Sequence, residues 1–107
     1  MKRTLVISDR AHQDIERNVL WWAGNNSLTQ AIEWQNAVYD QLETIPQLPE
    51  SYPLASENLK FAYEIREKNV GLSVGGYRAV FTIHGDQIHI LTIRRAAQRG
   101  LRPEDLG

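Results

Sequence analysis

The 107-residue sequence contains no cysteine, so it can form neither a disulfide scaffold nor a thiolate zinc site. It also lacks a long hydrophobic segment, because its longest apolar run, Val19–Ala23, is far too short to cross a bilayer. No basic stretch followed by a hydrophobic one comes after Met1, so we expect no export signal. These absences predict a cytoplasmic protein that does not enter a membrane.

A large excess of charge of one sign is missing too. The net charge of −1 argues against a protein that holds nucleic acid by bulk electrostatics. The charges are nevertheless unevenly distributed. Residues 1–58 carry four Lys/Arg against eight Asp/Glu, whereas residues 59–107 carry eight against five, giving −4 and +3. We therefore expect an anionic ligand to meet the second half of the chain.

What is present is the composition of an ordinary globular domain, with 42% apolar and 23% charged residues. The length is close to the commonest domain size, so we expect a single domain over residues 1–107. Its core should span residues 3–99, with a tail at 100–107. The tail either begins a short helix at Pro103 or pairs with a partner, and the sequence leaves both open.

The first half predicts a short strand at Lys2–Ile7 and then two helices, each preceded by a serine that can cap it, Ser8 and Ser27. Gly24–Asn26 should end the first helix and Pro46 the second. The apolar residues that recur at helical spacing are Ala11, Ile15, Val19 and Trp22, then Ala31, Trp34, Val38, Leu42 and Ile45. The short link between the helices predicts an antiparallel hairpin.

The second half predicts three antiparallel strands after a loop at 47–58. Apolar and polar residues alternate over Phe61–Arg66, as in a half-buried strand, and Val70–Gly76 is expected to be a loop. Two further strands should flank a tight turn at Gly85-Asp86. The predicted fold class is α+β: an N-terminal strand, an α-helical hairpin, and a three-stranded antiparallel meander that completes one sheet with the helices on one face.

The turn also predicts which side chains share a face. If His84 opposes Gln87, then Val80 opposes Leu91 and Arg78 opposes Ile93. The face packed on the helices would hold Tyr77, Ala79, Phe81, Ile83, Ile88, Ile90, Thr92 and Arg94. The opposite, open face would hold the candidate binding residues Glu64, Arg66, Arg78, His84, His89 and Arg95.

These convergent arginines suit an anion such as phosphate, because a guanidinium offers a planar fork of donors. The alternative is a solvated face whose charges only keep the sheet soluble. His84 and His89 have no acidic partner at a ligand spacing, so we predict no metal and no cofactor. Trp21, Trp22 and Trp34 recur at helical spacing and are expected in the core rather than stacked on bases.

The order of these segments, with Glu64-Ile65-Arg66, Tyr77-Arg78-Ala79-Val80-Phe81 and Ile88–Arg95, resembles the RelE/ParE superfamily. Its members are the toxins of bacterial type II toxin–antitoxin modules, often described as plasmid stabilisation proteins. The likeness covers roughly residues 3–99. It implies growth inhibition and a cognate antitoxin as partner, and it leaves the oligomeric state open.

RelE-like members cleave messenger RNA on the ribosome, and this branch would assign catalysis to Arg66, Arg78 and Arg95, with Arg94 beside them. Many relatives have a His-Gly-x-Arg segment where this chain has Arg95-Ala96-Ala97-Gln98-Arg99. No tyrosine follows Tyr77 and no histidine follows His89, so the usual late acid or base is missing.

ParE-like members inhibit DNA gyrase and need no nuclease residues. The long helical hairpin and the acidic first half resemble this branch, so the resemblance favours gyrase inhibition. The two alternatives are a ribosome-dependent mRNA endoribonuclease and a non-toxic binding module with the same fold.

Overall fold

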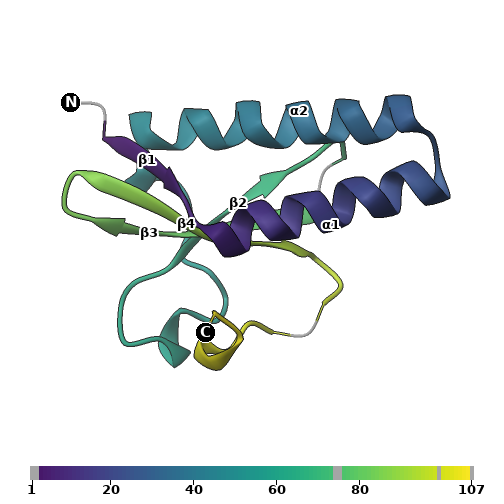
Figure 1. Cartoon of the computed structure of the whole chain (residues 1–107). Coiled ribbons are helices and arrows are strands. Elements are labelled where there is room, and N and C mark those ends of the chain that lie inside the picture. Colours follow the sequence, from purple (N-terminus) through teal and green to yellow (C-terminus); the bar gives the residue numbers. More distant parts are fainter. Residues whose placement is uncertain (1–2, 74–75, 99, 107) are drawn as a thin grey trace.

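The computed structural model describes residues 3–73, 76–98 and 100–106. The elements in chain order are β1 (Thr4–Ile7), α1 (Asp9–Asn25), α2 (Leu28–Thr44), β2 (Arg66–Val70), β3 (Tyr77–His84) and β4 (Gln87–Arg95). The strands form one sheet in the order β1-β4-β3-β2, in which β1 runs parallel to β4 and the other pairs are antiparallel. The α1–α2 hairpin covers one face of this sheet (Figure 1). The predicted α+β fold class is confirmed.

Both predicted helix caps are present. The Ala11 amide donates to Ser8 Oγ at 3.0 Å, and the Gln30 amide donates to Ser27 Oγ at 3.1 Å. Each serine therefore satisfies a backbone donor that the first turn of its helix leaves without a partner. None of the described helices is long and apolar enough to span a membrane.

The main core lies between the helical hairpin and the sheet, where the predicted helical stripes meet the predicted helix-facing strand residues. Trp34 is fully buried and packs against the ring of Tyr77, with ring centroids 4.9 Å apart. Trp22 is partly buried against the same core, as expected. Trp21 was also expected in the core, but it is 42% exposed.

The strand predicted at Phe61–Arg66 is wrong, because β2 covers Arg66–Val70. Phe61 and Ile65 instead pack in or against a second, smaller cluster on the face opposite the helices. The Ile65 amide is held by the side chain of Asn58 rather than by a neighbouring strand. The alternation of apolar residues thus reflects packing of a loop, while the true edge strand is polar and carries no such signal.

The sheet face predicted to be open is partly covered. Ala55, Ile65, Val80 and Leu101 are buried together, so the 52–65 loop and the C-terminal tail close over the middle of the sheet. Both segments lie on the side of the sheet away from the hairpin in Figure 1. The tail forms a short 3-10 helix, Pro103–Leu106, which is the first of the two alternatives for this segment.

The β3–β4 hairpin follows the predicted register only as far as the middle of the strands. His84 opposes Gln87 across the turn, where Gly85 adopts a φ of 61° that glycine accepts at little cost. The register then shifts between Val80 and Phe81, so that Val80 opposes Thr92 and Leu91 is the extra residue of a bulge.

This bulge exchanges the faces of the two arginines at the end of β4. Arg78 opposes Arg94, not Ile93 as predicted. Arg95 opposes the core residue Tyr77 and lies over the ring of Trp21 on α1. A shift of one residue moves every later side chain to the other face of a strand. The predicted placement of Arg95 on the face of Arg78, and of Arg94 on the helix side, is therefore wrong.

Candidate functional site

Arg78 lies on the face opposite the helices, as predicted, and is held by two carboxylates. Its Nη1 donates to Glu57 Oε1 and to Glu67 Oε1, each at 2.9 Å, and its Nη2 donates to Glu57 Oε2. The Arg78 side chain is only 12% exposed. We call Arg78, Glu57 and Glu67 the Arg78 cluster. One guanidinium meets two carboxylates there, so the cluster has no positive charge to spare.

The ionisation of Glu57 shows how tightly this cluster is held. Burial alone would raise the pKa of Glu57, but hydrogen bonds from Arg78, from the Leu101 amide and from the Ser56 hydroxyl lower it to about 2. The hydrogen bond to Glu57 in turn raises the pKa of Arg78. Because the Leu101 amide donates to Glu57 at 2.8 Å, the same carboxylate also anchors the tail.

Arg66 does not join Arg78, contrary to the prediction. It opposes Phe81, a residue of the core beneath the helices, so it begins β2 on the other face of the sheet. Its Nε donates to Glu64 at 3.0 Å and its Nη1 donates to the carbonyl of Tyr52 at 2.6 Å. On β2, Asn69 opposes Arg78, and Glu67, two residues earlier on the same face, supplies the carboxylate that Arg78 binds.

Glu64, His84 and His89 do come together, in a cleft of about 450 Å³. The two imidazole rings lie edge to face with centroids 6.1 Å apart, and His89 contacts Gln87 Oε1 at 2.9 Å. The cleft also includes Leu91, the bulge residue. No cluster of three or more metal-ligating side chains occurs in the described ranges.

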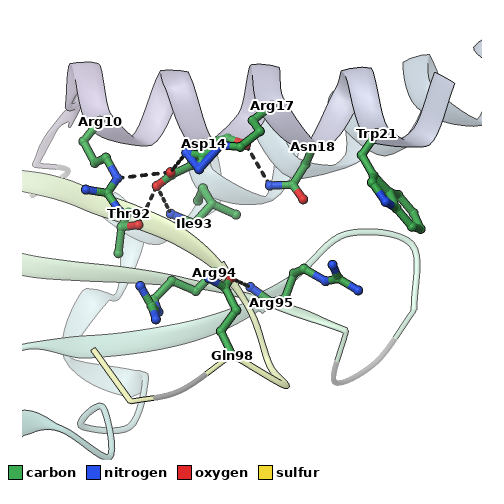
Figure 2. A pocket seen from close by; sticks show the side chains of 10 residues that line it. All are labelled: Arg10, Asp14, Arg17, Asn18, Trp21, Thr92, Ile93, Arg94, Arg95 and Gln98. Atoms are coloured by element: carbon green, nitrogen blue, oxygen red, sulfur yellow. Dashed lines mark hydrogen bonds and ion pairs between the residues drawn. The ribbon is translucent and has the colours of Figure 1, made fainter. Parts of the chain in front are cut away.

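A second polar cavity, of about 280 Å³, lies where α1 runs beside the end of β4 (Figure 2). We call it the Asp14 pocket, and its lining residues are Arg10, Asp14, Arg17, Asn18, Trp21, Thr92, Ile93, Arg94, Arg95 and Gln98. Four of these residues are arginines and only one is acidic. The Asp14 pocket thus has more guanidinium groups than carboxylates, whereas the Arg78 cluster has more carboxylates than guanidinium groups.

The pocket exists because β1 is shorter than β4. β1 pairs with β4 only as far as Ile90, after which Ser8 Oγ donates to the Leu91 carbonyl and the chain turns into α1. The edge of β4 beyond that point is bonded by a side chain, since the Ile93 amide donates to Asp14 at 3.2 Å. The Asp14 carboxylate thus takes the place of the missing strand.

Asp14 is 3% exposed and its carboxylate is fully engaged. Arg10 Nε donates to its Oδ1 at 3.1 Å, Arg17 Nη2 donates to the same oxygen at 2.6 Å, and the Thr92 hydroxyl joins the Ile93 amide on Oδ2. The sequence prediction missed this residue. The available signal was an acidic residue beside a buried helical stripe, with arginines four positions before it and three after.

Arg94 and Arg95 leave β4 in opposite directions in Figure 2. Arg94 is 4% exposed, whereas Arg95 is exposed. The Arg95 guanidinium lies 5.4 Å from the ring centroid of Trp21, in a cation–π contact. Both arginines line the Asp14 pocket. Arg94 also opposes Arg78 across the strands, but Arg66 and Arg95 lie on the other face, so the four arginines do not share one surface.

The chain is similar to known toxins over nearly its whole length. The family model described as "ParE toxin of type II toxin-antitoxin system, parDE" matches residues 5–100. A structure of the chromosomal ParDE system from P. aeruginosa matches with a TM-score of 0.74 at 18% identity, covering 88% of this chain and 96% of that one. No match was found among curated proteins.

A mutant of the E. coli toxin RelE in the free state has the same fold, with a TM-score of 0.55 at 16% identity, over 91% of this chain and 86% of that one. The resemblance to the RelE/ParE superfamily is therefore confirmed. The family model spans both helices and all four strands of the sheet. The chain belongs to the ParE toxin family of type II toxin–antitoxin systems.

Proposed function

We propose that this ParE-type toxin inhibits DNA gyrase and does not cleave messenger RNA. Membership of the family implies a cognate antitoxin as partner. The observation that carries the choice of target is the state of Arg78. Two carboxylates already neutralise its guanidinium, so it has little capacity to stabilise the charge of a phosphate in a cleavage reaction.

The placement of the other candidate catalytic residues supports the same choice. Arg66 lies on the opposite sheet face, bound to backbone carbonyls, and Arg95 lies against α1. In-line cleavage of RNA requires charged and proton-transferring groups within hydrogen-bond reach of one phosphate. Arg66, Arg78 and Arg95 occupy three separate places, so a nuclease site built from them has no support here.

The cleft of Glu64, His84 and His89 is a candidate contact surface for a protein partner. Its lining includes the apolar residues Tyr63, Ile83 and Leu91, and Tyr63 is 47% exposed. Exposed apolar surface of this kind is typical of protein-binding sites. A protein target such as gyrase, met in the cytoplasm, fits this surface better than ribosomal RNA does.

The test is a supercoiling assay with purified gyrase, relaxed plasmid and purified toxin, run beside a translation extract in which a reporter mRNA is mapped for cuts. We expect loss of supercoiling and intact mRNA, with supercoiling restored by the cognate antitoxin. Arg78→Lys keeps one charge beside Glu57 but loses the fork, and the folded variant should still inhibit gyrase. Cuts in ribosome-bound mRNA with normal supercoiling would overturn the proposal, as would normal activity in both assays.

A further inference from the structure

We propose that the Asp14 pocket binds the phosphate group of a nucleotide, with the base against Trp21. This site lies beside the edge of β4; of its described lining residues, it shares Gln98 with the pocket at the Arg78 cluster and none with the cleft of His84 and His89. It needs neither gyrase nor the antitoxin, so it stands or falls independently of the proposed target.

The charge balance of the pocket favours an anionic ligand. Four arginines line the cavity against the single carboxylate of Asp14. That carboxylate already accepts from Arg10, Arg17, the Thr92 hydroxyl and the Ile93 amide, which is about the number of acceptor sites that a carboxylate offers. Arg10 also donates to the carbonyl of Asp105, so the donors that a bound anion could use are mainly those of Arg17 and Arg95.

Arg17 and Arg95 provide most of the N–H donors that the Asp14 carboxylate does not accept. Arg17 has a side chain that is 63% exposed, and its one hydrogen bond to a described residue is to Asp14. The Arg95 guanidinium contacts the Trp21 ring but makes no hydrogen bond or ion pair with the rest of the described chain. Both groups keep several N–H donors for a ligand.

The excess of positive charge and of N–H donors in the Asp14 pocket favours a phosphate over a carboxylate as the ligand. A single carboxylate supplies one negative charge, whereas a phosphate monoester supplies about 1.5 to 2 and three acceptor oxygens for guanidinium forks. The volume of about 280 Å³ lies just below the range of about 300–1,000 Å³ that is usual for small-molecule sites. It accommodates a phosphate with its sugar more readily than a large cofactor.

Trp21 supplies the second half of a nucleotide site. Its ring is 42% exposed although it sits on a helix whose other large aromatic, Trp22, packs on the core. An exposed indole beside arginines is the arrangement on which nucleobases stack, with a gain of about 1–3 kcal/mol per base in proteins that bind single strands. The ring of Trp22 contacts the Trp21 ring edge to face, with centroids 5.6 Å apart, and so helps to hold the indole beside the pocket.

The experiment measures thermal stability and binding by calorimetry for the full chain with sodium phosphate, AMP and, at matched ionic strength, sodium chloride. We expect saturable stabilisation by both phosphate compounds, with AMP the stronger. The double variant Arg17→Gln, Arg95→Gln should bind AMP at least about tenfold more weakly. Trp21→Leu should reduce the affinity for AMP to that for phosphate.

The control for each single change, Arg17→Gln or Arg95→Gln, is Arg3→Gln, which likewise removes one positive charge, from a residue that pairs with Glu50 near the other end of β4. It should bind AMP as the unaltered protein does. Equal losses in Arg3→Gln and in either single variant would show general charge attraction and overturn the proposal. So would the absence of any saturable response to about 10 mM AMP.

A second measurement does not depend on the double variant being folded. The indole N–H signal of Trp21, assigned by its loss in Trp21→Phe, should shift in the NMR spectrum on addition of AMP to the unaltered protein. The indole nitrogens of Trp22 and Trp34 are buried, so their N–H signals should move less. A spectrum in which the Trp21 signal does not move would overturn the placement of the base.

Discussion

The Arg78 cluster and the Asp14 pocket are built from the same two chemical groups in opposite proportions. On the sheet face, one guanidinium is shared by Glu57 and Glu67; beside β4, one carboxylate is shared by Arg10 and Arg17. Both centres are buried, Glu57 at 5% and Asp14 at 3% exposure. The comparison shows that the ratio of the partners, and not the number of arginines, decides which centre can accept an anion. The Arg78 cluster therefore stabilises the fold, whereas the Asp14 pocket has arginine donors that a ligand can use.

The Arg78 cluster should therefore matter most for stability. Arg78→Met removes the guanidinium and leaves Glu57 buried without its counterion, so we expect a loss of about 3–5 kcal/mol in the free energy of unfolding, measured with urea. Adding Glu57→Gln should recover a large part of this loss, because the buried charge is then removed and the remaining carboxylate, Glu67, is partly exposed to water. A loss below about 1 kcal/mol for Arg78→Met would show that the Arg78 cluster does not stabilise the fold.

The Asp14 pocket should show a smaller loss with a different signature. Asp14→Asn weakens hydrogen bonds from two arginines and from the edge of β4, and we expect about 2 kcal/mol of destabilisation. Millimolar phosphate should restore more stability to this variant than to the unaltered protein, because the anion replaces the lost negative charge. Equal restoration in both proteins would instead indicate the general effect of phosphate on protein surfaces.

The contrast between the two centres also explains which features could be predicted from the sequence. Local rules suffice for the caps at Ser8 and Ser27 and for the turn at Gly85, because each depends on neighbouring residues. The family resemblance rests on the order of such elements. The caps, the turn and the fold class are therefore confirmed.

The site could not be predicted in the same way because it depends on register over longer distances. No glycine or proline marks the bulge at Leu91, yet this one residue sends Arg94 and Arg95 to opposite faces. Glu57 reaches Arg78 from a loop 21 positions away, and Asp14 reaches Ile93 from 79 positions away. Pairings of this kind follow from the tertiary fold, so the counter-charges of the arginines were not visible in the sequence pattern.

Acid should test the ion pair between Glu57 and Arg78 directly. The pKa of Glu57 is lowered from 4.5 to about 2, so its contribution to stability is fully present above pH 4.5 and is lost as the pH falls toward 2. The stability of the unaltered protein should therefore decrease over this window, by at most about 1.4 kcal/mol per pH unit from this group. In Arg78→Met, burial without the guanidinium favours the protonated form, so the same window should show a flatter or reversed slope. Identical slopes in the two proteins would contradict the role of Arg78.

The smallest effect on stability is expected at Arg95, so this residue should separate ligand binding from structural stabilisation. Arg95 is exposed and its guanidinium contacts only the Trp21 ring within the described chain, so Arg95→Gln should cost no more than about 0.5–1 kcal/mol by urea unfolding. The same change should weaken AMP binding about tenfold, because a guanidinium donates charge-assisted hydrogen bonds that glutamine cannot. Arg78→Lys is the matched opposite, with an expected loss of stability and unchanged affinity for AMP. If Arg95→Gln is as destabilising as Arg78→Lys while AMP binding is unchanged, then Arg95 stabilises the fold. The Asp14 pocket would then be a structural centre like the Arg78 cluster, and not a ligand site.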